Sequence, residues 1–149
     1  MYEIDLSTVM LIGLDEYKTK IITLDNEFIL DLDSKKIIDN SCKFFGSSLN
    51  DRVNMTRRLV NIKSKSPIII EDSRDIIFFP LKSIRDKCNI WISFNNLEKY
   101  VKSGNKTVFI FKNSKEVIID FSYYIIDNQV TRSLMLDYEI KKRRESLKK

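Results

Sequence analysis

Several residue types on which enzymes and metal sites depend are scarce or missing in this sequence of 149 residues. Histidine is absent, which removes the most frequent general base near neutral pH, the most frequent metal ligand, and all Ser-His or Cys-His pairs. The two cysteines, Cys42 and Cys88, form no CxxC pair, so both are expected to be reduced and buried. No P-loop, GxGxxG or HExxH motif occurs. We therefore expect no enzymatic activity, no metal and no cofactor.

Long hydrophobic runs and secretion signals are missing as well. No apolar segment approaches the roughly 18 residues of a membrane span, and the N-terminus carries acidic residues where a signal peptide would carry basic ones. A cytoplasmic, nucleoid-associated protein without membrane attachment is expected. With 43% hydrophobic and 11% aromatic residues, the chain can bury a core of its own, so we expect one domain over residues 1–149.

Acidic and basic residues are unevenly distributed. Residues 1–40 hold 4 Lys and Arg against 9 Asp and Glu, whereas residues 41–149 hold 22 against 12. A local basic excess favours binding to a polyanion, because neutralised phosphates release counterions. An AT-rich coding sequence would also enrich Lys, Ile and Asn and deplete Ala, which is absent here. Charge alone therefore leaves open nucleic acid, an anionic membrane surface and a plain solvated surface.

Hydrophobic patterns predict an α+β fold, built mainly on antiparallel β-sheet with hairpins. Strands are expected where β-branched and aromatic residues cluster between turn residues, at 8–14, 18–24, 26–32, 68–71, 76–79, 89–93, 107–111 and 115–120. The first three should form an antiparallel meander. The hairpin turn at Asn113-Ser114 requires Ser114 to adopt a positive φ or the loop to lengthen.

Three helices are predicted between and after these strands. The first spans about 49–61 and follows the SCKFFGSS segment, with Ser47 or Ser48 as N-cap. The second is short, over 95–101, and the third is long, starting after Ser122 and ending in the basic sequence KKRR, which is expected to fray into solvent.

The predicted helix over 49–61 has a polar face. At about 100° per residue, its amide and guanidinium side chains share one arc, which suits contacts to DNA. These residues are Asn50, Asn54, Arg57, Arg58 and Asn61. Arg52 falls within the apolar arc instead, where it could anchor a loop through a carboxylate or backbone carbonyls.

The segment Ser41–Lys65 has six basic residues and one acidic residue. It could bind the phosphates and grooves of DNA, or it could be a solvated helix face beside a buried pair, Phe44 and Phe45. Trp91 alternates as a strand residue should, which favours the core over base stacking. The carboxylates Glu71, Asp72 and Asp75 are better explained by a turn than by a metal site.

Five short motifs together resemble the ComK family, the competence transcription factors of Gram-positive bacteria. They are SCKFFGSSLNDR, KSPIII, IIFFPLKS, CNIWIS and NQVTRS, in this order, and the resemblance extends from about Asp39 to Arg132. It implies a transcription activator that binds AT-rich promoter DNA largely through the minor groove, as a homodimer and as paired dimers on one promoter. The transcription machinery is a further expected partner, and the long C-terminal helix is the expected dimer element.

We therefore expect the DNA site in and after the basic segment. Its predicted residues are Arg52, Asn54, Arg57, Arg58, Lys63 and Lys65, with Lys82, Arg85 and Lys87 on a following loop. The alternative is a non-enzymatic interaction module, an adaptor or regulator, that uses the same basic face on an acidic protein.

Overall fold

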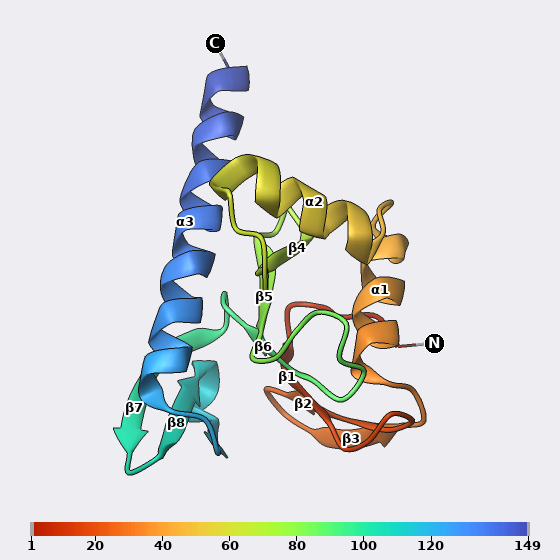
Figure 1. Cartoon of the computed structure of the whole chain (residues 1–149), viewed down its shortest axis with the longest axis vertical. Coiled ribbons are helices and arrows are strands. Elements are labelled where there is room, and N and C mark those ends of the chain that lie inside the picture. Colours follow the sequence, from red (N-terminus) through yellow and green to blue (C-terminus); the bar gives the residue numbers. More distant parts are fainter. Residues whose placement is uncertain (1, 149) are drawn as a thin grey trace.

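Two antiparallel sheets and three helices make up residues 2–148, the part of the chain that this computed structural model describes (Figure 1). This confirms the predicted α+β class and the long C-terminal helix. In chain order the elements are β1 (Thr8–Gly13), β2 (Thr19–Thr23), β3 (Glu27–Leu30), α1 (Ser34–Phe44), α2 (Leu49–Val60), β4 (Ile68–Glu71), β5 (Ile76–Pro80), β6 (Ile90–Ser93), β7 (Leu97–Ser103), β8 (Lys106–Phe111), a 3₁₀ turn (Lys112–Ser114), β9 (Glu116–Ile119) and α3 (Tyr123–Leu147).

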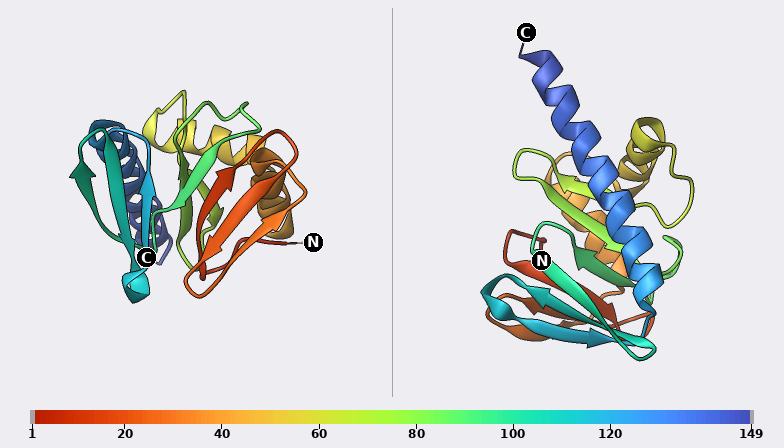
Figure 2. Two further views of the ribbon diagram at one scale, coloured as in Figure 1. Left: turned by 90° about the horizontal axis from the view of Figure 1, so that it is seen from below. Right: turned by 90° about the vertical axis from the view of Figure 1, so that its left-hand side faces the viewer.

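The six-stranded sheet, in the order β3-β2-β1-β6-β5-β4, is the middle layer of the fold (Figure 2). The predicted meander is its first half, β1 to β3. Consecutive strand residues face opposite sides, so that Leu11 and Phe78 pack with α1 and α2 while Met10 and Phe79 pack with the small sheet and α3. Both faces of the central strands are buried, which explains their runs of adjacent apolar residues. Trp91 is fully buried between this sheet and the first two helices, as predicted.

Two helices cover one face of this sheet, and only α2 was predicted. Its N-cap is Ser48, whose side chain accepts a hydrogen bond from the Asp51 N–H at 3.0 Å. In α1 one buried position is Ser41, whose hydroxyl donates to the carbonyl of Ile37 and accepts from the Ile4 N–H. This hydroxyl interrupts the apolar stripe in the sequence, so the helix was missed. The predicted burial of the Phe pair is wrong for Phe44, which is 64% exposed.

The segment after β6 is a strand, and the short helix predicted over 95–101 is wrong. Asn96 donates from its side-chain amide to the carbonyls of Leu6 and Thr8, which fixes the turn at 95–96 that leads into β7. From Leu97 onward the chain pairs with β8. Pairing with β8 across the two-residue turn Gly104-Asn105 therefore outweighs the helical spacing of Leu97 and Tyr100. In the hairpin that follows, Ser114 has a φ of 59°, as the turn requires.

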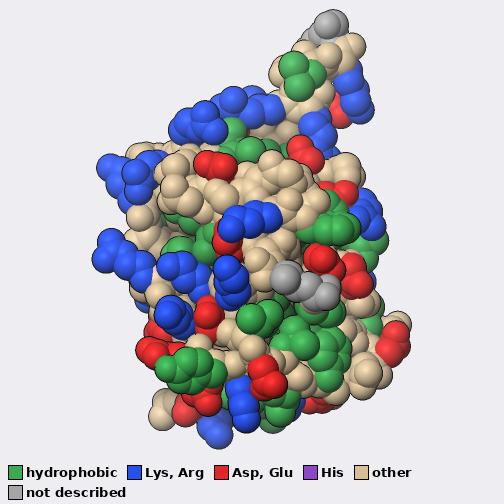
Figure 3. Space-filling model, turned by 90° about the vertical axis from the view of Figure 1, so that its right-hand side faces the viewer, with side chains coloured by type: hydrophobic (Ala, Val, Ile, Leu, Met, Phe, Trp, Pro, Cys, Tyr) green, Lys and Arg blue, Asp and Glu red, His purple; other side chains and the backbone are tan. Residues whose placement is uncertain are grey.

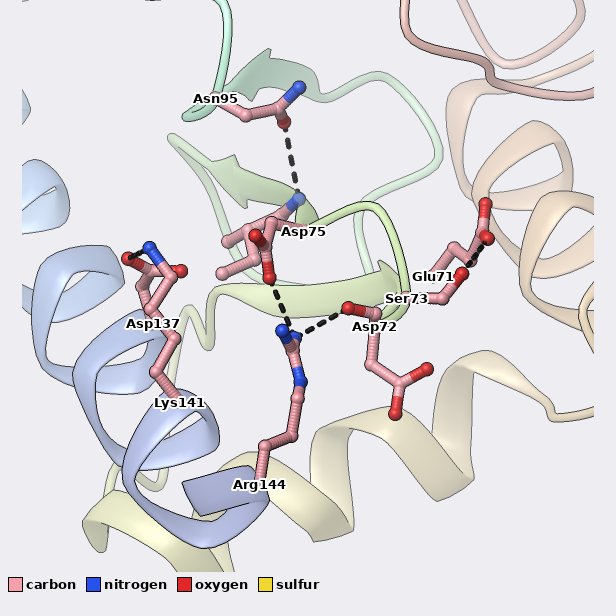
Figure 4. A network of polar contacts seen from close by, with 9 residues as sticks. Glu71, Asp72, Ser73, Asp75, Asn95, Asp137, Lys141 and Arg144 are labelled. Atoms are coloured by element: carbon pink, nitrogen blue, oxygen red, sulfur yellow. Dashed lines mark hydrogen bonds and ion pairs between the residues drawn. The ribbon is translucent and has the colours of Figure 1, made fainter. Parts of the chain in front are cut away.

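Helix α3 runs along one side of the molecule, from the small sheet past the end of α2 (Figure 1). Its N-cap is Ser122, and it continues to Leu147. The predicted fraying of its basic end is therefore wrong. Figure 4 shows why: Arg144 donates to the Asp75 carboxylate at 2.6 Å and also to the carbonyl of Asp72, in the turn between β4 and β5. The acidic residues of this turn therefore hold the helix end. None of the helices within residues 2–148 is long and apolar enough to cross a lipid bilayer.

Both cysteines are free, and they differ in burial. Burial raises the pKa of the Cys42 thiol to about 12, so this side chain acts as a small apolar residue of the core. Cys88 is only half-buried, and its Sγ lies 3.3 Å from the carbonyl oxygen of Gly13. The expected burial is therefore confirmed for Cys42 and wrong for Cys88.

Candidate nucleic-acid interface

The polar face predicted for α2 is exposed along the helix. Its five members, Asn50, Asn54, Arg57, Arg58 and Asn61, are all exposed. Asn61 ends the helix with a φ of 57°, a left-handed conformation that asparagine tolerates, and turns the chain into a loop over 61–67. On the buried side, the Thr56 hydroxyl donates to the carbonyl of Pro67 at 2.7 Å and ties this loop to the helix. The helix that carries the polar face and the loop that follows it are therefore held together.

Arg52 does not share this face, because its side chain is only 8% exposed. Its Nη1 lies 3.9 Å from the Met55 sulfur, and its Nε has no hydrogen-bond partner among the described residues. No carboxylate within residues 2–148 forms an ion pair with it. A buried guanidinium packs through its stem, which gives Arg52 a role between α1 and α2 rather than at the solvent.

A cleft of about 620 Å³ opens beside the polar face of α2. Its walls come from α1, α2, the loop 61–67 and the loop 81–89, so segments distant in sequence meet here. Four of the predicted DNA-binding residues line it, and α1 adds a fifth basic residue. These residues are Arg57, Lys63, Lys65, Arg85 and Lys35. Asn54, Arg58, Lys82 and Lys87 do not line the cleft.

The loop 81–89 is held in place by the fully buried side chain of Asn89. Its amide donates to the carbonyls of Lys82 and Ser83, and its Oδ1 accepts from the Lys82 N–H. The side-chain amine of Lys82 donates to the carbonyl of Cys88 at 3.1 Å, so Lys82 closes the loop on itself. The Lys87 carbonyl accepts from the Ser34 hydroxyl at 2.7 Å. The loop is thus fixed to the start of α1, and its exposed cations Arg85 and Lys87 have defined positions.

The basic residues around the cleft differ from many others in the molecule because they lack acidic partners. Eight Lys and Arg residues within 2–148 form ion pairs with carboxylates, among them Lys20, Lys43 and Arg144. No ion pair involves Lys35, Arg57, Arg58, Lys63, Lys65, Lys82, Arg85 or Lys87 in that range. Figure 3 shows Lys and Arg side chains gathered along the left-hand edge of the molecule, toward α2 and the loop 81–89. This surface is positively charged and unneutralised.

One carboxylate, that of Asp39, lies in the cleft. Its Oδ1 accepts from the Leu49 N–H at 3.0 Å, at the start of α2, and its Oδ2 pairs with Lys43 at 3.0 Å. Burial acts to raise the pKa of Asp39, but these hydrogen bonds and the nearby cations Lys43 and Lys36 outweigh it, so the pKa lies below its usual value. Asp39 is therefore an ionised link between α1 and α2, and its charge is already matched by Lys43.

Replacing Asp39 with Asn should lower the free energy of unfolding at pH 7 by about 1 kcal/mol, since the charged partner of Lys43 and of the α2 N-terminus is lost. The folded pKa of Asp39 is depressed, so its contribution is present above the unfolded pKa and disappears as the pH falls through the folded pKa. Urea unfolding at pH 7 and near pH 2 measures this. A difference of equal size at both pH values would contradict it, and Asp120→Asn, at an exposed site, is the control.

Comparison with known proteins connects this arrangement to a family. The family model described as ComK protein matches residues 1–145. The chain is also 34% identical over 137 residues to a protein of Bacillus subtilis (strain 168) described as a competence transcription factor, a match that covers 85% of this chain and 71% of that protein. The chain belongs to the ComK family. No solved structure matches it.

The ComK-family match runs from β1 to most of α3, so it includes α1, α2 and the two loops that build the cleft. Lys35 is the basic lining residue that sequence reasoning missed, because α1 itself was missed. A signal was present: Asp33 precedes a pair of lysines and caps α1, accepting from the Lys36 N–H at 2.8 Å. Within residues 2–148, no group of three or more His, Cys, Asp and Glu side chains could hold a metal ion.

Proposed function

We propose that this ComK-family protein is a DNA-binding transcription activator of the competence type, that residues 1–149 act as one DNA-binding unit, and that it recognises AT-rich boxes largely through the minor groove. One observation carries the proposal: basic residues from α1, α2 and two loops gather on one face without acidic partners. The name of the Bacillus subtilis relative, competence transcription factor, supports the same conclusion. Phosphates are the ligands that such a face attracts.

In the proposed complex, the exposed residues of α2 contact the groove of the DNA and those of the two loops contact its phosphates. Arg57 and Arg58 lie side by side near the end of the helix, and Asn54 is one turn earlier. Arginine is drawn to the narrow, strongly negative minor groove of A-tracts, and asparagine donates to the acceptors on base edges there. Lys63, Lys65, Arg85 and Lys87 would then hold the flanking phosphates, which position the protein without reading sequence. Arg52, which is buried, and Lys82, which closes its own loop, hold this surface in place instead of contacting DNA.

A homodimer is part of the proposal, with α3 as its interface. Leu134, Met135 and Tyr138 of α3 are 57%, 48% and 66% exposed. With Leu59 and Val60 of α2 they line an apolar groove of about 570 Å³. Exposed apolar patches of this kind mark interaction sites. A second copy is the occupant that fits best, since a dimer through α2 and α3 fixes the relative positions of two DNA-binding faces, as paired half-sites require.

Titration of two duplexes of equal length, one AT-rich and one GC-rich, tests the proposal. We expect the AT-rich duplex to bind at least about tenfold more tightly, with a salt dependence that corresponds to several released counterions. A drug that binds the minor groove should displace the protein from it. Fluorescence anisotropy at several salt concentrations measures all three effects. Equal affinity for both duplexes rules out minor-groove selectivity, and affinity without salt dependence points to the acidic-protein partner instead.

A further inference from the structure

Ser66 is a buried hydroxyl residue in the wall of the cleft. Its side chain is 1% exposed, and its Oγ has no hydrogen-bond partner among the described residues. Buried hydroxyl groups are almost always hydrogen-bonded, and leaving one unpaired costs free energy. Because its Oγ is covered in this structure, an acceptor group reaches it only after a side-chain shift in the cleft wall. An unpartnered hydroxyl beside basic residues fits a site that an acceptor group completes in this way.

The loop that carries Ser66 is held from behind by α3. The carbonyl of Lys65 accepts hydrogen bonds from the Gln129 amide at 2.9 Å and from Arg132 Nη1 at 3.4 Å. Gln129 is itself 2% exposed, also donates to the Pro80 carbonyl at 2.6 Å, and accepts from Arg132 at 2.8 Å. Lys65 adopts a left-handed φ of 47°, which costs free energy for a residue with a side chain. These hydrogen bonds maintain that conformation and set the direction in which the loop presents its side chains.

The charges around Ser66 favour an anion. Lys63, Lys65 and Arg85 line the cleft with no acidic partner within residues 2–148. The carboxylate of Asp39 is the opposing group, and its charge is matched by Lys43 at 3.0 Å. Lys35 adds a cation from the first turn of α1, where the helix dipole is also positive. The cleft therefore combines donors, positive charge and a fixed backbone, the features of a phosphate site.

We propose that this cleft is a seat for a phosphate group, built from Ser66, Lys63, Lys65 and Arg85, and that in the DNA complex it holds one phosphodiester of the backbone. The inference rests on the proposed DNA-binding function and deepens it, because it separates a phosphate seat from the groove-reading side chains of α2. Gln129 and Arg132 are positioning residues, since they act through the Lys65 carbonyl. The sequence NQVTRS, which led to the family resemblance, acquires a physical role through them.

Inorganic tripolyphosphate is a suitable probe, because it offers phosphate oxygens without bases or a groove. In the ¹⁵N-labelled full chain, it should shift the amide signals of residues 63–66 and Arg85 and compete with the AT-rich duplex.

Ser66→Ala should weaken the binding of tripolyphosphate about tenfold, the usual effect of losing one hydrogen bond to a charged group, while the unfolding midpoint stays the same or rises. The double variant Lys63→Gln/Arg85→Gln should weaken both ligands. Lys99→Gln/Lys106→Gln, on the exposed β7–β8 hairpin, is the control with the same charge change.

The role of Arg132 is tested with two substitutions. Arg132→Met removes the donor to the Lys65 carbonyl and should weaken tripolyphosphate, whereas Arg132→Lys keeps a donor and should restore part of the affinity. Equal affinity in the two variants would contradict a positioning role.

The outcomes separate the seat from the DNA function. If the duplex binds with AT preference but tripolyphosphate shifts the control hairpin as much as the cleft, or Ser66→Ala changes nothing, the seat is wrong and the proposed function stands. If tripolyphosphate binds the cleft but no duplex binds, the seat serves a free phosphate compound and the proposed function fails. Competition between the two ligands supports both.

Discussion

Removal of both adjacent arginines of α2, Arg57→Ala/Arg58→Ala, should weaken binding to an AT-rich duplex about a hundredfold at moderate salt. The two side chains are exposed near the end of α2 and have no acidic partner within residues 2–148, so their charge is available to DNA. Arginine contacts in a groove are worth about 1–3 kcal/mol each, and each lost phosphate contact lowers the salt slope by about 1. Anisotropy titrations at several salt concentrations measure both quantities.

The fold should survive this change. Both side chains lie in the last turn of α2, where their charges favour the negative end of the helix dipole, but alanine has the higher helix propensity. The free energy of unfolding should therefore change by less than about 1 kcal/mol, and the oligomer should match that of the unchanged protein. Lys99→Ala/Lys106→Ala removes the same charge from the β7–β8 hairpin and should have a small effect on DNA affinity. If this control weakens binding as much as the α2 variant, net charge explains the result and the site is not on α2.

The basic face could be predicted from the sequence because it depends on local structure. Once Ser48 is recognised as a helix cap, the helical repeat alone places Asn54 and Arg57 on one solvent-facing arc. Arg52 falls on the other side by the same geometry, and the structure buries it. The hairpin turns were also local, since Asp75 and Asn113, which adopt positive φ, are of residue types that tolerate it.

The cleft could not be predicted, because four separate segments build it. Lys35 enters it from a helix that Ser41 obscured in the sequence, and the conformation of Lys65 depends on donors from Gln129. The strand β7 was mistaken for a helix because Leu97 and Tyr100 are spaced as in a helix, although β8 follows directly across the turn Gly104-Asn105. The hydrogen bonds of Asn96 to Leu6 and Thr8, which fix the start of β7, are long-range. Spacing within a segment carries no information about such partners.

The apolar groove on α3 leads to the second large expected effect. Leu134→Glu/Tyr138→Glu should convert the proposed dimer into monomers, because two charges without partners would destabilise an apolar interface at this groove. Binding to a duplex with two half-sites should then fall by about a hundredfold or more, since the second contact is no longer intramolecular. Affinity for a single half-site should stay the same. Sedimentation velocity and anisotropy titrations on both duplexes measure these effects.

A second exposed apolar surface provides the matched control. Val101 and Ile118 lie in register with Val108 on the three-stranded sheet and are 46% and 62% exposed. Val101→Glu/Ile118→Glu adds the same charge to a surface far from α2 along the chain. If this variant becomes monomeric while the α3 variant stays dimeric, the copies meet through the sheet, and the DNA-binding faces are not coupled through α3. If α3 is the interface, Leu134→Glu/Tyr138→Glu becomes monomeric and Val101→Glu/Ile118→Glu stays dimeric. Only the first variant should then bind paired half-sites more weakly, because its two DNA-binding faces are no longer linked.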